Sequence, residues 1–271
     1  MLASARGGAP GASGVSGGSV MGAVYSSVAR LFELGFRVTG VERRVDGLEH
    51  LPASGPAIIA SNHVGYVDYA FVMLGPPRPR REVAFLARSD FFEQPLVGTA
   101  LRALRQIPVD AHGDPAGALR AAVSHLEAGG IVGLHPEGTI NPSFLPLKGR
   151  TGAVRLAQLT GAPIVPTAVW GSQRLLTKWR PPAWPERRIP VRVIYGEPYH
   201  PGEGRPAALT LDLMARIRAL VKQAIRDEGA PPGSWWVPAA HGGSAPDPEE
   251  VAARLAEQAR ERRERRLGRK S

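Results

Sequence analysis

This chain of 271 residues has no cysteine, few aromatic side chains and no long apolar run. Without cysteine, disulfide bonds, thiolate metal sites and cysteine nucleophiles are excluded. The longest stretch without a charge, residues 7–29, is rich in Gly and Ser, whereas a membrane-spanning helix needs about 20 mostly apolar residues. The first residues also lack the charged and apolar regions of a secretory signal. We therefore expect a cytoplasmic protein without a membrane span.

The composition suits a globular domain with a basic surface. Hydrophobic residues make up 43% of the chain, which is ample for a core, and 32 Gly and 26 Pro imply many turns. The net charge is +10 and the pI is near 10.7. Such a balance favours an anionic partner, namely nucleic acid, an anionic membrane surface or a phosphate-rich substrate. A solvated basic face without a ligand is the alternative.

The N-terminal part divides into two segments. Of residues 1–20, 14 are Gly, Ala or Ser, so this segment buries too little apolar surface to fold and is expected to be disordered. Residues 21–34 carry apolar side chains at helical spacing, and Gly35 suits the end of a helix. The amphipathic helix predicted here either packs on the core or lies in a membrane interface.

Between residues 36 and 228, apolar runs that predict strands alternate with stretches of helical periodicity. The predicted strands cover residues 38–45, 57–61, 83–87, 107–109, 131–134, 164–169 and 189–195. The predicted helices cover residues 66–74, 94–104, 114–128, 151–159 and 209–227. This order predicts an α/β fold, with one domain over residues 21–228 whose mixed, mostly parallel sheet is flanked by helices. Active-site loops are expected beyond the strand ends.

The C-terminal part is predicted to be a linker followed by a charged helix. Residues 229–248 are rich in Pro and Gly and contain Trp235 and Trp236, which either dock on the domain or enter a lipid interface. Residues 249–271 hold eight Arg or Lys against five Glu and have a thin apolar stripe. This basic helical tail is either a solvated charged helix or attracted to anionic lipid, at about 1 kcal/mol per basic residue near the surface.

A histidine and an aspartate five residues apart follow the second predicted strand. They are His63 and Asp68, in the stretch Asn-His-Val-Gly-Tyr-Val-Asp. Histidine suits a general base because its unperturbed pKa is about 6.5, and a carboxylate on its other ring nitrogen fixes the tautomer. On a regular helix the two side chains would point about 140° apart. We therefore expect His63 in a loop, Asp68 in the first helical turn, and a flexible bend at Gly65.

A second polar segment, His-Pro-Glu-Gly-Thr, follows a predicted buried strand. Beside Glu137, Gly138 and Thr139 can present N–H groups and a hydroxyl to developing negative charge, although a plain strand-to-helix turn capped by Thr fits as well. Lys148 and Arg150 then precede a Gly-containing helix start, which suits a phosphate. Each of these signals is weak when taken alone.

In their order and spacing, these elements resemble the glycerolipid acyltransferase family, whose best-known members are the 1-acylglycerol-3-phosphate acyltransferases. The resemblance spans roughly residues 36–199, with a motif core over residues 58–171. The segments similar to the four family blocks are Asn-His-Val-Gly-Tyr-Val-Asp at 62–68, Gln-Ile-Pro-Val-Asp at 106–110, Pro-Glu-Gly-Thr at 136–139 and Ala-Pro-Ile-Val-Pro-Thr-Ala-Val at 162–169. The first and third blocks in combination are quite specific.

This resemblance implies transfer of a fatty acyl group from acyl-CoA, or an acyl carrier protein, to a lysophosphatidate-type hydroxyl in phospholipid synthesis. His63 would be the general base and Asp68 would orient it, with no covalent enzyme intermediate. Glu137, Gly138 and Thr139 would shape the acceptor pocket. No metal or redox cofactor is needed. The implied partners are acyl-CoA, a lysophospholipid acceptor and an anionic membrane surface, with the protein peripheral on the inner face of the cell membrane.

Two positions depart from the family pattern. Arginines associated with the acceptor phosphate are replaced by Ala111 after the second block and by Ile140 after the third. Neither side chain can form the bidentate phosphate contacts of arginine. Either Arg88, Lys148 or Arg150 takes the phosphate, or the acceptor carries no glycerol phosphate and is, for example, a lyso-aminolipid or a glycolipid.

Two other functions are alternatives. A nucleic-acid-binding protein fits the high pI, but such a site interleaves basic residues with aromatics, and the chain after Asp247 has no aromatic. Nucleic acid is therefore not expected as a partner. A hydrolase would use the same pair, His63 and Asp68, to activate water in place of an acceptor hydroxyl.

Overall fold

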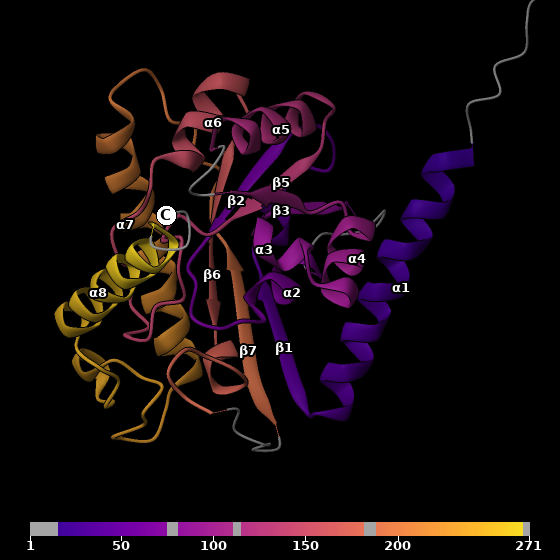
Figure 1. The fold of residues 1–271 in the computed structure, drawn as a ribbon. Coiled ribbons are helices and arrows are strands. Elements are labelled where there is room, and N and C mark those ends of the chain that lie inside the picture. The colour runs from indigo at the N-terminus through magenta and orange to yellow at the C-terminus, as the bar shows by residue number, and fades with distance from the viewer. Residues whose placement is uncertain (1–15, 75–80, 111–114, 182–187, 268–271) are drawn as a thin grey trace, which may run out of the picture.

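The computed structural model describes residues 16–74, 81–110, 115–181 and 188–267 (Figure 1). A seven-stranded sheet with the order β1-β7-β6-β2-β5-β3-β4 forms its centre. The strands are β1 (Val41–Asp46), β2 (Ala57–Ser61), β3 (Val83–Arg88), β4 (Ile107–Val109), β5 (Ile131–Leu134), β6 (Ile164–Trp170) and β7 (Ile189–Tyr195). Neighbouring strands pair in parallel except β6 and β7, which are antiparallel. The predicted mixed, mostly parallel sheet is confirmed.

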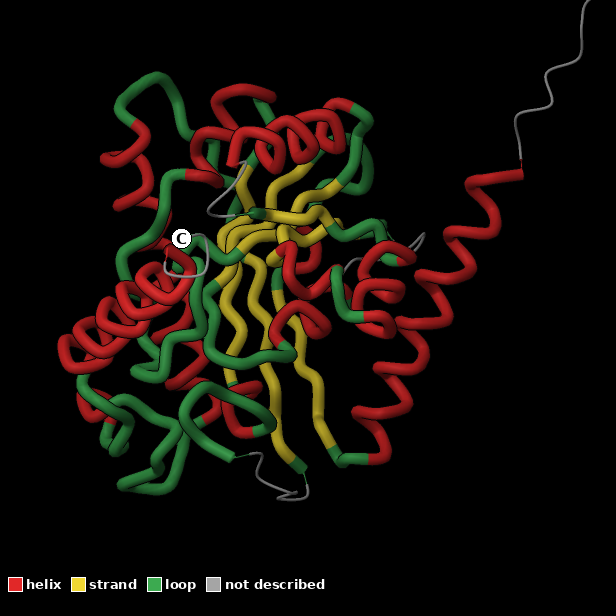
Figure 2. The backbone as a smooth tube through the Cα atoms, viewed as in Figure 1, coloured by secondary structure: helices red, strands yellow, loops and turns green. Residues whose placement is uncertain are grey.

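Helices cover both faces of the sheet (Figures 1 and 2). They are α1 (Ser16–Val38), α2 (Asp68–Met73), α3 (Ser89–Phe92), α4 (Pro95–Ala103), α5 (Pro115–Glu127), α6 (Gly152–Thr160), α7 (Pro206–Glu228) and α8 (Pro248–Leu267). Side chains of α5, α6 and α7 belong to one core cluster, and side chains of α1 and α2 belong to the other. β2, β5 and β6 are buried along their whole length, as expected for parallel strands covered on both faces. The loops after these three neighbouring strands therefore meet at one edge of the sheet.

Element boundaries differ from the predicted ones at a few places. β1 begins at Val41 rather than at residue 38, because α1 extends to that point. α7 begins at Pro206, where proline suits the first helical turn. The single turn α3 was not predicted from periodicity, since it is too short to show one. Residue 114, the predicted start of the helix seen as α5, lies outside the described residues.

The N-terminal helix α1 starts earlier than predicted. It begins at Ser16, so residues 16–20, which were expected to be disordered, are helical, whereas residues 1–15 lie outside the described residues. Among the described residues, no helix combines enough length with enough hydropathy to span a bilayer. One side of α1 packs on the sheet through Tyr25 and Ala29, which are both buried.

The same helix also continues past Gly35, the predicted end, to Val38. The reason is Phe36, whose ring stacks on that of Phe71 with centroids 4.3 Å apart and keeps the last turn on the core. Gly40, at φ 71°, follows the helix and takes the left-handed conformation that suits a glycine. Tertiary packing thus overrides the local stop signal.

The Pro/Gly-rich segment after α7 folds back onto the domain. Trp236, Val237 and Ala245 are buried in the core cluster that includes α7. The carbonyl of Trp236 accepts a hydrogen bond from Gln173 Nε2 at 3.2 Å, and its ring lies 6.2 Å from that of Trp170. Of the two expected roles for the tryptophan pair, docking on the domain is therefore the one that Trp236 takes.

In the view of Figure 1, helix α8 starts at the margin of the domain and crosses in front of it toward the end marked C. Asp247 Oδ1 caps it by accepting the N–H of Glu249 at 2.7 Å. Val251 is buried, and the guanidinium of Arg254 lies over the ring of Trp179, 4.0 Å from its centroid. The first turns of the predicted basic tail are therefore attached to the protein.

Candidate active site

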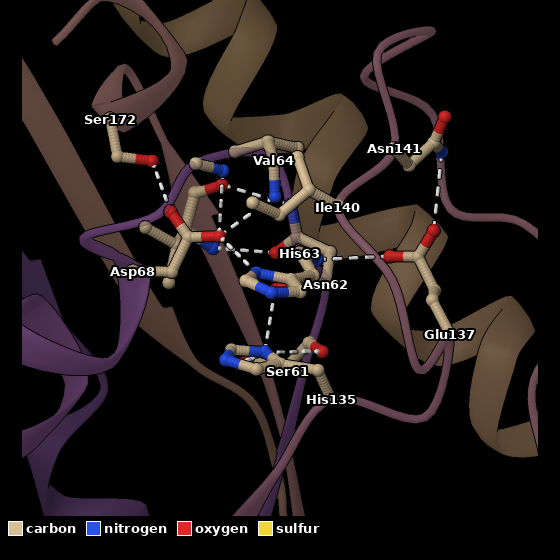
Figure 3. Close-up of polar contacts among 12 residues, drawn as sticks. Ser61, Asn62, His63, Val64, Asp68, His135, Glu137, Ile140, Asn141 and Ser172 are labelled. Atoms are coloured by element: carbon tan, nitrogen blue, oxygen red, sulfur yellow. Dashed lines mark hydrogen bonds and ion pairs between the residues drawn. The ribbon is translucent and has the colours of Figure 1, made fainter. Parts of the chain in front are cut away.

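The loop between β2 and α2 is anchored to the neighbouring strand β6 by Asn62. Its side-chain oxygen accepts the N–H of Val169 at 2.7 Å, and its Nδ2 donates to the carbonyl of Val169 at 2.9 Å. The amide thereby completes the ladder at the point where β2 ends. This fixes the position of the next residue, His63 (Figure 3).

Asp68 is fully buried at the start of α2 and accepts four hydrogen bonds. Its Oδ2 accepts from His63 Nδ1 at 2.9 Å, from the N–H of Val64 at 2.7 Å and from the N–H of Gly65 at 2.9 Å. Its Oδ1 accepts from the hydroxyl of Ser172. The predicted geometry is confirmed, with the histidine in a loop and the aspartate in the first helical turn.

The network around Asp68 fixes the proton on His63. Because the carboxylate accepts at Nδ1, that nitrogen carries the hydrogen and Nε2 carries the lone pair, a tautomer assigned from its hydrogen-bond partner. The His63 side chain is 21% exposed, whereas that of Asp68 is fully buried. The pair therefore places an oriented, partly exposed imidazole in front of a shielded carboxylate.

Gly65 has a different role from the flexible bend that we expected. Its φ is not positive, but a Cβ at this position would lie 3.0 Å from the carbonyl oxygens of Ser172 and Leu176. The N–H of Tyr66 donates to Leu176 O at 2.9 Å, and Thr177 also bonds this loop. Glycine is needed here because two loops approach each other closely.

Glu137, in the loop after β5, directs both carboxylate oxygens inward. Oε1 accepts the N–H of His63 at 2.9 Å, and Oε2 accepts the N–H of Leu147 at 2.9 Å and Asn141 Nδ2 at 3.1 Å (Figure 3). Burial raises the pKa of Glu137 to about 7, although the three N–H donors act in the opposite direction. The carboxylate thus joins the histidine loop to the segment that follows β5.

Two other predicted residues, Gly138 and Thr139, form the turn beside this carboxylate. Gly138 has φ 66°, and a Cβ there would lie 2.8 Å from Arg150 Nε, so the guanidinium covers the turn. Arg150 is also tied to the turn by its backbone N–H, which donates to Pro136 O at 2.8 Å. Lys178 Nζ donates to Thr139 Oγ1 at 2.8 Å.

The remaining predicted basic residues lie apart from this turn or point into solvent. Arg88 ends β3, where it forms an ion pair with Asp90 and its guanidinium lies 5.5 Å from the centroid of the Phe91 ring. The side chain of Lys148 is exposed. Of the three cations expected at a phosphate, the structure brings Arg150 to the Gly138–Thr139 turn.

His135 is a site residue that the sequence prediction missed. Its ring stacks on that of His63 with centroids 4.0 Å apart and planes 4° from parallel. Its Nδ1 lies 3.0 Å from Ser61 Oγ and 3.1 Å from the carbonyl of Asn62. Burial, with the nearby His63, lowers the pKa of His135 to about 3, so the ring is neutral. Ala60 pairs with Leu134 across β2 and β5, and this register places the two histidines, which follow these strands, side by side.

The two departures from the family pattern fall in different settings. Ile140 is buried, at 5% exposure, close to the His63 loop (Figure 3). Asn141, which follows it, bonds Glu137, and the N–H of Asn141 donates to His63 O at 2.8 Å. Ala111 lies outside the described residues. At position 140 the chain thus packs an apolar side chain where the resemblance to the family implies a cation.

Residues 42–170 match the family model described as Acyltransferase. This range runs from β1 to the end of β6 and includes His63, Asp68 and Glu137. The matched range therefore contains both the parallel core of the sheet and the histidine–carboxylate site. Fold, site and family match together define the class of the protein, which is an acyltransferase.

Similarity to known proteins shows to which family of acyltransferases this chain belongs. The chain is 31% identical over 187 residues to the 1-acyl-sn-glycerol-3-phosphate acyltransferase of Bacillus subtilis. The match covers 65% of this chain and 87% of that protein. It is 29% identical over 164 residues to the chloroplastic 1-acyl-sn-glycerol-3-phosphate acyltransferase LPAT1 of Arabidopsis thaliana, covering 58% of this chain and 43% of that one. The chain belongs to the glycerolipid acyltransferase family of these enzymes.

The fold is shared with a solved structure, that of the 1-acyl-sn-glycerophosphate acyltransferase of Thermotoga maritima. The TM-score is 0.66 at 22% sequence identity, and the match covers 78% of this chain and 84% of that chain. At this level of identity the match shows the fold alone. It agrees with the α/β architecture that the alternation of strands and helices predicts.

Proposed function

We propose that this acyltransferase moves a fatty acyl group from acyl-CoA, or from an acyl carrier protein, to the free hydroxyl of a lysophosphatidate-type acceptor. The observation that carries the proposal is the 2.9 Å bond between His63 Nδ1 and Asp68 Oδ2. This bond leaves His63 Nε2 as a basic nitrogen on a ring that is 21% exposed, so an acceptor hydroxyl can reach it.

In the proposed reaction the acceptor O–H gives its proton to His63 Nε2 while its oxygen bonds to the thioester carbonyl carbon. The imidazolium that forms is stabilised by Asp68, which keeps its hydrogen bonds from two backbone N–H groups and a hydroxyl throughout. The carbon–sulfur bond then breaks, and the leaving thiolate takes the proton from His63. The base is restored without a covalent acyl-enzyme and without a metal or redox cofactor.

In this proposal, Glu137 acts on the acceptor site indirectly. Its carboxylate accepts three N–H donors, one of them the backbone of His63, and so holds the base and the Gly138–Thr139 turn in one frame. The turn itself, with Arg150 over it, is the proposed wall of the acceptor pocket. A carboxylate that faced the acceptor directly would repel its phosphate.

The acceptor decides between the two versions of this function. The second version keeps the same acyl transfer but uses an acceptor without glycerol phosphate, such as a lyso-aminolipid or a glycolipid. The observation that favours it is the buried Ile140, which cannot bind a phosphate. Release of free thiol from oleoyl-CoA is measured with lysophosphatidate, glycerol 3-phosphate, a lyso-aminolipid and a mannosylated lipid, and products are identified by mass spectrometry. Turnover with lysophosphatidate supports the first version, and thiol release without any acceptor indicates a hydrolase.

The proposed partner surface is an anionic membrane, which the protein meets with α1 and α4. These helices contact each other and expose large apolar side chains. The exposed side chains are Leu31 (69%), Leu34 (57%) and Val38 (78%) on α1, and Leu96 (87%) and Val97 (42%) on α4. Exposed arginines on the same helices, Arg30, Arg37 and Arg102, add attraction to anionic lipid. This surface supports a peripheral position on the inner face of the cell membrane.

A further inference from the structure

The loop after β6, residues 171–181, reaches both sides of the active site. Thr177 Oγ1 donates to the carbonyl of Val64 at 2.6 Å, directly beside the catalytic histidine. The next residue, Lys178, donates from Nζ to Thr139 Oγ1 at 2.8 Å. Its ammonium group therefore lies on the Pro-Glu-Gly-Thr segment, although Lys178 is remote from that segment in sequence.

Two cations from separate parts of the chain thus converge on one turn. Lys178 bonds Thr139, and the guanidinium of Arg150 lies over Gly138, where a Cβ would come within 2.8 Å of Arg150 Nε. The resemblance to the glycerolipid acyltransferases implies an arginine directly after this turn, and here that position is the buried Ile140. The positive charge absent at position 140 is supplied at the same turn by the 171–181 loop.

The two residues that follow Lys178 are held in place by the C-terminal segment. Arg254 of α8 lies 4.0 Å from the ring centroid of Trp179, and Arg180 lies 4.1 Å from that of Trp235. Trp179 has φ 62°, a left-handed conformation that is costly for a bulky side chain and persists only where its surroundings enforce it. These contacts orient the 171–181 loop so that Lys178 points to the turn.

We propose that Lys178 binds the phosphate monoester of the acceptor and so sets acceptor specificity; the inference rests on the proposed acyl transfer. An ammonium group has three N–H donors, so Lys178 can keep its bond to Thr139 while it donates to a phosphate oxygen. In a 1-acylglycerol 3-phosphate, the free hydroxyl and the phosphate ester are on neighbouring carbons. A hydroxyl at His63 Nε2 leaves the phosphate on the next carbon, and the Gly138–Thr139 turn directly follows Glu137, whose Oε1 accepts the N–H of His63.

The test compares Lys178→Met and Lys178→Arg with wild type on two acceptors, lysophosphatidate and monoacylglycerol, which lacks the phosphate. The matched control is Lys222→Met, which removes a lysine from the exposed side of α7. Lys178→Met is expected to raise KM for lysophosphatidate about ten- to a hundredfold and to leave kcat within a few-fold. Rates with monoacylglycerol stay at the wild-type level, and Lys178→Arg recovers most of the loss.

Acyl-CoA also carries a phosphate monoester. The KM of acyl-CoA therefore shows whether Lys178 binds the phosphate of the acceptor or that of the acyl donor. An increase confined to the KM of acyl-CoA would overturn the proposal, as would an equal loss on both acceptors, because the latter indicates only a structural bond to Thr139. Equilibrium binding of lysophosphatidate without acyl-CoA completes the test. If wild type binds this lipid more tightly than Lys178→Met but does not acylate it, Lys178 is confirmed and the proposed reaction fails. If both bind equally, the role of Lys178 is rejected.

Discussion

The imidazole of His135 stacks on that of His63 with the two planes 4° from parallel, and each ring is bonded by different groups. His63 gives its Nδ1 hydrogen to Asp68, whereas His135 Nδ1 faces Ser61 Oγ and the carbonyl of Asn62. A neutral ring thereby supports the face of the proposed base without competing for its proton. The stack restricts rotation of the His63 ring, which favours an orientation ready for reaction.

Replacing His135 by Phe should change how stability depends on pH. The pKa of His135 is lowered to about 3 in the folded protein, from an ordinary value of 6.5. The unfolded chain therefore binds a proton below pH 6.5 that the folded protein does not bind. The stability contributed by the neutral ring is complete above that pH and is lost on acidification, at about 1.4 kcal/mol per pH unit.

The measurement is the free energy of unfolding from urea titrations between pH 4 and 7.5. Wild type should lose stability relative to His135→Phe as the pH falls through this range. The phenyl ring preserves the stack, so kcat should stay within about tenfold, whereas His135→Ala should lower it further. Parallel pH profiles for wild type and His135→Phe would show that the histidine is not neutral in the folded protein.

Glu137→Gln should give the opposite dependence on pH. Burial raises the pKa of Glu137 to about 7, above its ordinary value of 4.5, so the folded protein holds this proton more tightly than the unfolded chain. The contribution of Glu137 to stability is therefore greatest below pH 4.5 and falls by up to about 3 kcal/mol as the pH rises through 7. Glutamine has no such dependence.

The glutamine amide would also place its own N–H group next to an N–H donor of His63, Leu147 or Asn141. The lost hydrogen bond should lower the free energy of unfolding by about 1–3 kcal/mol. Glu137→Gln should thus be less stable than wild type, by more at pH 5 than at pH 8. Urea titrations at the two pH values measure this difference. A larger gap at pH 8 would contradict the assigned ionisation of Glu137.

The sequence predicts the parts of this molecule that depend on local pattern. Buried runs and helical periodicity give the alternating strands and helices, and the spacing of His63 and Asp68 predicts a loop followed by a helical turn. Arg88 shows the limit of such reasoning, because basic character alone does not reveal that its side chain pairs with Asp90. The end of α1 is another case, since packing of Phe36 carries the helix past its stop signal.

Contacts that depend on which strands and loops become neighbours could not be predicted in this way. His135 meets the His63 ring through the pairing of β2 with β5, and that pairing has no local signature. Ser172 and Lys178 reach the site on a loop that is more than 100 residues from Asp68 and 39 residues from Thr139. Their positions follow from the strand order, in which β6 lies next to β2.

Ser172→Ala tests whether the carboxylate behind the base needs its hydroxyl donor. Without Ser172, one oxygen of the buried Asp68 loses its side-chain partner, and we expect kcat to fall about tenfold with KM nearly unchanged. Ser124→Ala, on the exposed side of α5, is the control. A kcat equal to that of the control would show that the bond is dispensable.

Replacing Leu31, Leu34 and Val38 of α1 by Ser should weaken binding to anionic vesicles, because each loses an exposed apolar side chain that can enter the interface. Vesicle co-sedimentation at low and high salt measures the effect. Leu159→Ser, which removes an exposed leucine from α6, is the control. Deleting residues 248–271 should remove only a salt-sensitive part of the binding. Wild-type partitioning of the triple variant would exclude α1 as the membrane surface.

The most direct test of the central claim is acyl transfer by His63→Ala, measured as thiol release from oleoyl-CoA with a lipid acceptor. Circular dichroism and the melting temperature establish that the variant is folded, and His200→Ala controls for loss of an exposed histidine elsewhere. We predict that His63→Ala loses at least about a thousandfold in kcat while His200→Ala keeps wild-type turnover. Turnover near the wild-type level in a folded His63→Ala would contradict the assignment of His63 as the general base.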